Sequence, residues 1–234
     1  MVIKTSTVAK YLTYMKKTPR QNRSAALVDS VFEAATHILE DSNGRDFDMP
    51  ALFKKAGVGA GSFYQYFYGR RSFIKAYCQR LAEKKAEEFL NKCWRLRQEG
   101  VTPQDILDTM VDTIVLDLIG PKSKVRFAYP FVLKMGLQHE MLKIREIFHK
   151  AMIEEAKFYV RSDVSDHELQ HITYVFIHAF MGVIWVYANG LQSNTQVEEL
   201  QIQLKNLARA YLSPCLKNEF SEVLHRRTEQ IAAV

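Results

Sequence analysis

Cysteine is scarce in this sequence of 234 residues, and no two cysteines lie close together. Cys78, Cys93 and Cys215 form neither a paired metal motif nor a C-x-x-C redox motif, so we expect reduced thiols. The first 23 residues lack the long apolar run and the small-residue cleavage site of a secretory signal peptide. These absences favour a cytoplasmic protein over a secreted, disulfide-bonded one.

Acidic residues are absent from the first 28 positions. The six basic residues before Asp29 account for the whole net charge of +6, because the other 26 of the 32 basic residues balance the 26 acidic ones. They are Lys4, Lys10, Lys16, Lys17, Arg20 and Arg23. A basic arm at residues 1–22 would either contact the phosphates or minor groove of a nucleic acid or remain a solvated tail. The sequence leaves both interpretations open.

The strict alternation of apolar and polar residues that marks half-buried strands is not sustained anywhere, and no internal repeat is present. Apolar residues instead recur at steps of three and four, as they do from Leu27 to Leu39. The composition, 47% apolar and 25% charged, is typical of soluble globular proteins. We therefore expect an all-α fold.

Two short helices separated by glycine are predicted around residues 48–67. Asp48 suits an N-cap, and Pro50 is tolerated in the first turn because its missing N–H has no helical partner. Gly57 ends this helix, since a residue without Cβ adopts positive φ at no steric cost. The small residues Gly59-Ala60-Gly61-Ser62 begin the second helix. A helix, a tight glycine turn and a helix led by small residues form a helix-turn-helix arrangement.

Residues 23–77 resemble the DNA-binding domain of the TetR family of bacterial transcriptional regulators. The matching residues are Ala34-Ala35, Leu52, Ala56-Gly57-Val58, Gly61-Ser62-Phe63-Tyr64, Tyr66-Phe67 and Arg70. The sequence departs from the family pattern at Gly59 (usually serine), Ala60 (often lysine), Phe53 (usually alanine) and Arg70 (usually lysine). The resemblance implies a DNA-binding domain at 23–77, whose last helix runs on to about residue 97, and a ligand-binding and dimerisation domain at 98–234.

The resemblance also implies the residues that would contact double-stranded DNA. Small residues at the start of the second helix would admit it to the major groove, and the side chains that follow would reach bases and phosphates. The predicted set is Asp48, Lys55, Gly59, Ala60, Gly61, Ser62, Tyr64, Gln65, Tyr66 and Arg70. A phosphate-cradling loop of nucleotide-binding proteins is disfavoured, because no strand pattern precedes Gly57.

Residues 172–188 form an almost wholly apolar run that is slightly short for a membrane span and contains a histidine. A helix buried on two sides explains this pattern better. In the family, the last two main helices of each subunit form a four-helix dimer interface. The resemblance therefore implies a homodimer with no membrane partner. The predicted interface residues are Val175, His178, Met181, Gly182, Trp185, Leu200, Leu204, Leu207 and Tyr211.

Aromatic residues and methionines are abundant between residues 106 and 185. Such residues at helical spacing usually form a core, but the family encloses a ligand cavity between the corresponding helices. The resemblance therefore implies a small, largely apolar effector, because few charges interrupt these faces. The predicted lining residues are Phe127, Phe131, Met135, Phe148, Met152, Phe176 and Phe180.

The string His167-Glu168-Leu169-Gln170-His171 matches the H-E-x-x-H motif of zinc peptidases, in which two histidines share one helix face. No third histidine follows at metzincin spacing, and Ser165 with Glu168 also matches a capping box. We predict no metal site, no cofactor and no enzymatic activity. The expected function is a ligand-responsive transcriptional regulator, most simply a repressor, that binds a palindromic operator. A zinc hydrolase and an effector-independent DNA-binding dimer are the alternatives.

Overall fold

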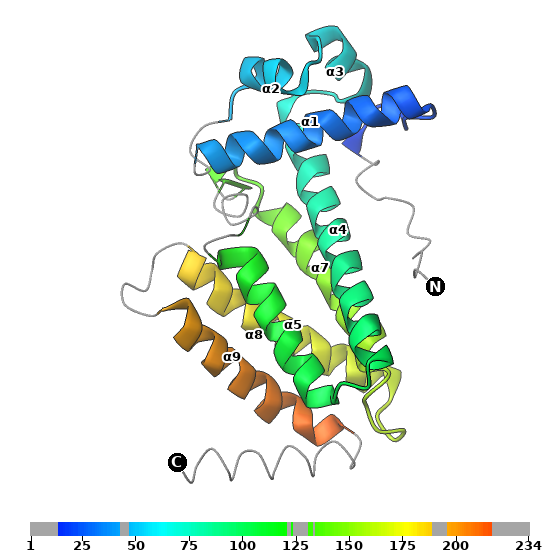
Figure 1. Cartoon of the computed structure of the whole chain (residues 1–234), viewed down its shortest axis with the longest axis vertical. Helices are drawn as coiled ribbons and strands as arrows, with labels where there is room; N and C mark the ends of the chain where they lie inside the picture. Colours follow the sequence, from blue (N-terminus) through cyan, green and yellow to red (C-terminus); the bar gives the residue numbers. More distant parts are fainter. Residues whose placement is uncertain are drawn as a thin grey trace. The chain divides into compact units, whose positions relative to one another are not determined.

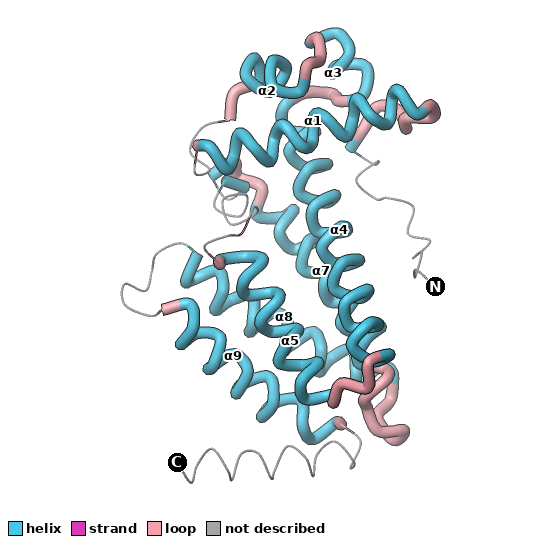
Figure 2. The backbone as a smooth tube through the Cα atoms, in the orientation of Figure 1, coloured by secondary structure: helices cyan, strands magenta, loops and turns pink. Residues whose placement is uncertain are grey.

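The computed structural model describes residues 14–42, 47–120, 123, 131–132, 134–188 and 196–216. Figure 2 shows helices joined by loops, and the described residues contain no β-strand. The only extended pairings among them are isolated bridges of Met15 with Phe67 and of Val160 with Leu216. The prediction of an all-α fold is confirmed.

The helices follow one another in the order that Figure 1 labels. They are α1 (Asn22–Asp41), α2 (Met49–Ala56), α3 (Ala60–Tyr66), α4 (Arg70–Gln98), α5 (Pro103–Ile119), α7 (Gln138–Ala156), α8 (Asp166–Ala188) and α9 (Val197–Leu212). A single turn of 3₁₀-helix, Ser213–Cys215, follows α9.

The chain divides into two compact units. The head unit comprises Lys4–Lys84 and Lys122–Ile144, and the body unit comprises Met1–Ile3, Lys85–Pro121 and Arg145–Val234. Helices α4 and α7 each contribute one part to each unit. This division differs from the domains expected from the sequence, because residues 122–144 belong to the head unit rather than to the regulatory domain.

An aromatic core holds the head unit together. The apolar residues of α1 recur at helical spacing, so that Val28, Phe32 and Leu39 share one buried face. Phe67 and Phe73 are wholly buried beside Phe32, with ring centroids 5.1 Å apart from each other and 5.8 and 5.5 Å from Phe32. Aromatic pairs at these separations add specific packing energy to the area they bury.

The body unit packs α5 against α8 and α9. One face of α8 is buried there, and its residues recur every three or four positions: Leu169, Thr173, Phe176, Ile177, Phe180, Met181 and Ile184. The opposite face leaves Tyr174, Val175 and Val183 exposed. Among the described residues, α8 is also the one helix whose length and composition would suit a membrane span, a test that core helices of soluble proteins pass as well.

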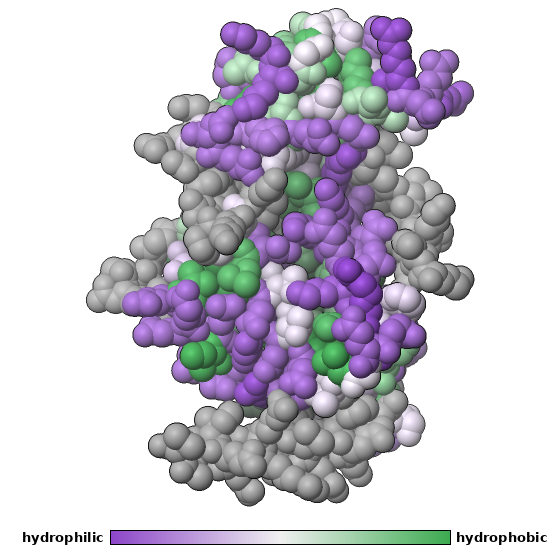
Figure 3. All heavy atoms as spheres, in the orientation of Figure 1, coloured by the Kyte–Doolittle hydropathy of each residue, from purple (hydrophilic) through white to green (hydrophobic). Residues whose placement is uncertain are grey.

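Polar contacts join α5 to α9 along one side of the body unit. Asp112 accepts hydrogen bonds from Lys205 at 2.7 Å and from Gln201 at 3.0 Å, and one turn earlier Asp108 is paired with Arg209. Hydrophilic side chains therefore cover much of this surface, and Figure 3 shows apolar patches only as islands between them.

Candidate nucleic-acid interface

Helices α2 and α3 meet at a sharp turn that local interactions explain. Asp48 caps α2, since its Oδ2 accepts a hydrogen bond from the amide of Ala51 at 3.1 Å. Gly57 lies in the left-handed region at φ 66°, which favours a residue without Cβ. The amide of Val58 then donates to the carbonyl of Phe53 at 3.0 Å. The predicted cap and glycine turn are both present.

The start of α3 presents backbone rather than side chains. Gly59 occupies the N-cap position and makes no side-chain cap, and Gly59, Ala60 and Gly61 are exposed. A Cβ added at Gly59 or Gly61 would meet no atom within 4 Å, and neither residue has positive φ. Among the described residues, neither packing nor backbone geometry therefore requires glycine at either position.

One side of α3 is buried and the other is open. Phe63 is wholly buried, whereas Tyr64 is 45% exposed and Gln65 is also exposed. Tyr66 is only 8% exposed, so the prediction that its side chain contacts DNA is corrected: its ring belongs to the head core. Ser62 is half-buried.

An aromatic contact fixes the position of Tyr64. The ring of Phe53 on α2 lies 5.2 Å from the ring of Phe63 and 6.3 Å from the ring of Tyr64. Phe53 is the residue that replaces the family's usual alanine. It therefore provides a contact between α2 and the exposed tyrosine of α3 that alanine lacks the atoms to make.

Cations outnumber carboxylates in the sequence around α3. From Met49 to Ala82 the sequence contains no aspartate or glutamate. It contains Lys54, Lys55, Arg70, Arg71, Lys75 and Arg80. Lys55, Lys75 and Arg80 are paired with carboxylates of other segments, which are Asp41, Glu140 and Asp29 in that order. The exposed Arg71 instead donates to the carbonyls of Met135 and Gly136 at 3.4 and 3.2 Å. Such a surface suits a polyanion.

The segment before α1 is attached to the end of α3. The amide of Lys16 donates to the carbonyl of Tyr66 at 2.7 Å, and Lys16 Nζ donates to the carbonyl of Tyr64 at 3.0 Å. Lys17 Nζ lies 3.5 Å from Gln65 Oε1. Sequence reasoning missed Lys54 as a member of this surface, and it left open whether Lys16 and Lys17 of the basic arm contact nucleic acid.

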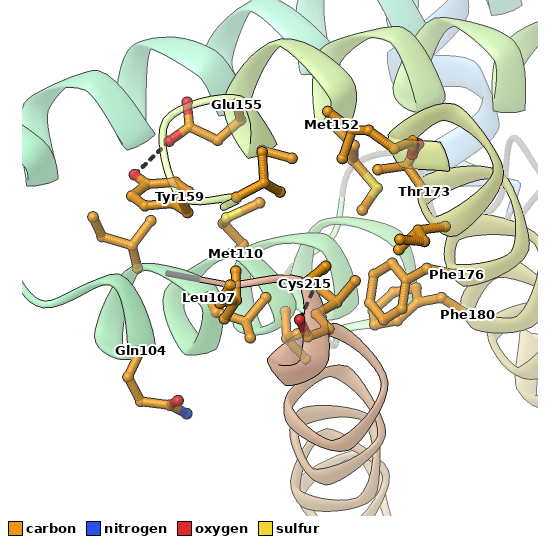
Figure 4. A pocket seen from close by; sticks show the side chains of 18 of the residues that line it. Gln104, Leu107, Met110, Met152, Glu155, Tyr159, Thr173, Phe176, Phe180 and Cys215 are labelled. Atoms are coloured by element: carbon orange, nitrogen blue, oxygen red, sulfur yellow. Dashed lines mark hydrogen bonds between the residues drawn. The ribbon is translucent and has the colours of Figure 1, made fainter. Parts of the chain in front are cut away.

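The body unit contains an apolar cavity of about 70 Å³ between α5, α7, α8 and the end of α9 (Figure 4). Three of the predicted lining residues, Met152, Phe176 and Phe180, line it. The sequence missed the contribution of α5, including Leu107 and Met110, and that of Cys215 and its neighbours.

The other predicted lining residues lie elsewhere. Phe131 and Met135 pack on the head core, where the ring of Phe131 lies 5.5 Å from that of Phe47. They are therefore corrected from cavity residues to core residues. Phe148 is buried but is not among the residues that line the cavity, and Phe127 falls outside the described residues.

A buried carboxylate lies at one wall of this cavity. Glu155 is 2% exposed, is paired with Arg97 from α4, and accepts a hydrogen bond from the hydroxyl of Tyr159 at 2.7 Å. Figure 4 shows the bond between Glu155 and Tyr159. Burial and the contact with Glu155 raise the pKa of Tyr159, while Arg97 opposes the rise. Because two of the three residues line the cavity, this cluster connects its wall to α4.

The H-E-x-x-H string begins α8. The amide of Glu168 donates to Ser165 Oγ at 3.1 Å, as the capping interpretation predicts. The rings of His167 and His171 are exposed with centroids 4.3 Å apart. Within the described residues, no group of three potential ligands is arranged to hold a metal ion.

The residues predicted for a dimer interface are divided between surface and core. Val175, Leu207 and Tyr211 are exposed, and His178, Gly182 and Trp185 are half-buried. Met181, Leu200 and Leu204 are buried in the body unit, so they are corrected to residues that hold α8 and α9 in place. The exposed apolar residues of these two helices also include Tyr174, Val183 and Ile202.

Solved structures with the same fold exist. A TetR-family transcriptional regulator from Streptomyces coelicolor is similar with a TM-score of 0.61 and 21% identity, over 83% of this chain and 100% of that one. A protein from Mesorhizobium loti assigned to the same family has a TM-score of 0.60 and 14% identity, over 84% and 100%. No protein-family model matches the sequence, and neither does any curated protein. The similarities show that the chain has the fold of these regulators.

Proposed function

We propose that the protein is a ligand-responsive transcriptional regulator that binds a palindromic DNA operator as a homodimer. The glycines that begin α3 carry the proposal. Glycine within a helix costs about 0.5–1 kcal/mol relative to alanine, and nothing in the described part of the chain requires it at Gly61. A close approach by another molecule explains both Gly59 and Gly61, and the floor and phosphate rim of a major groove fit that approach.

The charge distribution supports the same partner. Helix α3 presents Tyr64 and Gln65 for hydrogen bonding. The nearby cations that make no ion pair with a described carboxylate are Lys16, Lys17, Lys54, Arg70 and Arg71. Hydroxyl and amide groups contact base edges and phosphates, and cations release the counterions condensed on DNA. The proposed operator contacts are Lys54, Gly59, Ala60, Gly61, Tyr64, Gln65 and Arg70. Ser62 and Lys55 would lie at the edge of this contact surface.

A homodimer through α8 and α9 would place two α3 helices on two half-sites. Exposed apolar side chains on both helices, among them Val175 and Leu207, support this interface, because large apolar patches on a folded protein commonly mark contact sites. Light scattering of the wild-type protein should give twice the mass of one chain. Leu207→Glu should shift the mass toward the monomer, and a wild-type monomer at assay concentration would contradict the interface.

An apolar effector would act through the cavity of the body unit. The cavity is smaller than the roughly 300–1,000 Å³ of pockets that hold drug-sized ligands, so such an effector must expand it. Met110 and Met152 line it, and the flexible methionine side chain adapts readily to a new neighbour. Expansion would act on Glu155 and Tyr159, and through Arg97 on α4. Repression, relieved when the effector arrives, is the simplest outcome.

The function is tested by selecting duplexes from a random DNA pool with the purified protein, followed by salt titration of the selected sequence. A palindromic sequence bound with steep salt dependence is expected. Sequence-independent or absent binding by the protein, after extraction of bound apolar molecules, would contradict the proposal. Binding that no apolar compound releases would favour an effector-independent dimer.

A further inference from the structure

We infer that the segment formed by residues 14–20 is a second DNA-contacting element, in which Lys16 and Lys17 bind the phosphate backbone beside the sequence read by α3. The inference rests on the proposed function, because it concerns the same DNA. It distinguishes between the two interpretations of the basic arm that the sequence leaves open: a solvated tail and a nucleic-acid contact.

The segment is built into the head unit. Met15 is 6% exposed within the aromatic core, and its backbone forms an antiparallel bridge with Phe67 at the end of α3. Tyr14 donates its hydroxyl to Glu140 Oε2 at 2.6 Å and accepts from Lys143 at 3.0 Å. A solvated tail would make none of these contacts, so the position of the two lysines that follow is fixed.

The two lysines lie along the exposed part of α3. Lys16 and Lys17 are exposed, and within the part of the chain that the structure describes they bond Tyr64, Gln65 and Tyr66 rather than a carboxylate. Lys16 Nζ lies 5.5 Å from the ring centre of Tyr68, and Lys17 Nζ lies 4.7 Å from that of Tyr66. Both cations are therefore held beside the residues proposed to reach the operator, and no acid of the described segments compensates their charge.

A carbonyl contact does not neutralise an ammonium group, which keeps two further N–H donors for a ligand. An ammonium group recognises phosphate as a point charge, without the fork geometry that reads guanine. The partner group is therefore a backbone phosphate of the bound duplex, and the contact should add affinity and salt dependence without sequence preference. Thr18 and Arg20 are also exposed and extend the same segment toward α1.

The test compares wild-type protein with the double variant Lys16→Gln/Lys17→Gln on the selected operator, with binding measured by fluorescence anisotropy over a series of salt concentrations. Each lost phosphate contact lowers the magnitude of the salt slope by about 0.9, so a dimer should lose up to about 3.6. Binding at about 0.1 M salt should weaken by tenfold or more. The ranking of operator variants should not change.

Two further variants keep the result interpretable. Lys150→Gln/Lys157→Gln on α7 and just after it removes the same charge from exposed lysines of the body unit, and it should leave the slope unchanged. Lys16→Arg/Lys17→Arg should keep most of the slope. Unchanged thermal unfolding of the glutamine variant would show that α3 remains folded.

The outcomes separate the inference from the function on which it rests. If the wild-type protein binds its operator and Lys16→Gln/Lys17→Gln has the same slope and affinity, the inference is wrong and the proposed function stands. If the slope falls equally in the Lys150/Lys157 control, the effect is one of net charge and the inference is also wrong. If the wild-type protein binds no duplex, both proposals fail.

Discussion

The head and body units are stabilised in different ways. The head core is filled by aromatic rings, and Phe63, Phe67 and Phe73 are wholly buried. The body unit surrounds an apolar cavity of about 70 Å³ with flexible residues such as Met110 and Met152. A filled aromatic core holds α3 in one geometry, whereas a cavity lined by methionine can change shape at low cost. The first suits recognition of a fixed duplex, and the second suits a response to a small molecule.

The two units also use their charges differently. In the body unit, Asp108, Asp112 and Asp117 of α5 are paired with cations of α9 and α4. Beside α3 in the head unit, Lys16 and Lys17 contact carbonyls and rings instead, whereas Lys55 and Lys75 are paired with carboxylates. Paired charges join helices, and charges without a carboxylate remain available to an external anion.

The largest effect on stability is expected in the densely packed aromatic core of the head unit. Phe73→Ala should lower the free energy of unfolding by about 3–5 kcal/mol, because it removes a wholly buried ring and leaves a cavity among its neighbours. Met110→Ala, beside the existing cavity, should lower the free energy of unfolding clearly less than Phe73→Ala does. Urea denaturation of both variants measures how much each loses in free energy of unfolding. Equal losses would contradict the contrast between the cores of the head and body units.

The next effect concerns the buried ion pair of the body unit. Arg97→Met should lower the free energy of unfolding by about 3 kcal/mol, because it leaves the carboxylate of Glu155 buried without its cation. Arg97→Met/Glu155→Gln should recover part of this loss, since the second change removes the unpaired charge. Thermal unfolding at neutral pH provides the measurement, and equal stability of the single variant and the wild type would show that the pair is not buried in solution.

A smaller effect is expected at the attachment of the N-terminal segment. Tyr14→Phe should lower the free energy of unfolding by about 1.5–3 kcal/mol, because it removes the hydroxyl that bonds the charged groups of Glu140 and Lys143 and leaves the ring in place. Burial opposes ionisation of Glu140, but its bonds with Tyr14 and Lys75 outweigh burial and lower the pKa of Glu140.

The lowered pKa sets the pH dependence of this contribution. A carboxyl group with a lowered folded-state pKa stabilises fully above its unfolded pKa of about 4.3, and the effect disappears as pH falls through the lower folded value. The difference between Tyr14→Phe and wild type should therefore be constant near neutral pH and shrink in acid. A difference that grows in acid would contradict the assigned role of Glu140.

The smallest effect on stability is expected from Gly61→Ala, which should stabilise the protein rather than destabilise it. Gly61→Ala should raise the free energy of unfolding by about 0.5–1 kcal/mol, because the added Cβ meets no atom within 4 Å and alanine favours the helix. It should also weaken operator binding, because the methyl group would face the DNA. Gly57→Ala is the matched control, and it should destabilise because Gly57 has a φ of 66°. A Gly61→Ala variant that is more stable and binds equally well would refute the role assigned to this glycine.

The sequence predicted what local interactions decide. Asp48 caps α2 and Gly57 ends it because those residues act on amides and carbonyls within four positions. The contact of Lys16 with Tyr64 spans 48 positions, and no periodicity indicates such a pairing. Phe131 was assigned to the cavity for a similar reason: its aromatic character indicates burial, but not whether Phe47 or the helices of the body unit surround it.

The contact of Phe53 with Tyr64 has a consequence for engineering. A regulator with altered specificity is commonly sought by transplanting a recognition helix onto another scaffold. Here the exposed tyrosine rests on a ring from the preceding helix, and the end of α3 is bonded to a lysine from before α1. The smallest transferable module is therefore not α3 alone, and a functional graft would need Phe53 and the segment with Lys16 to move with it.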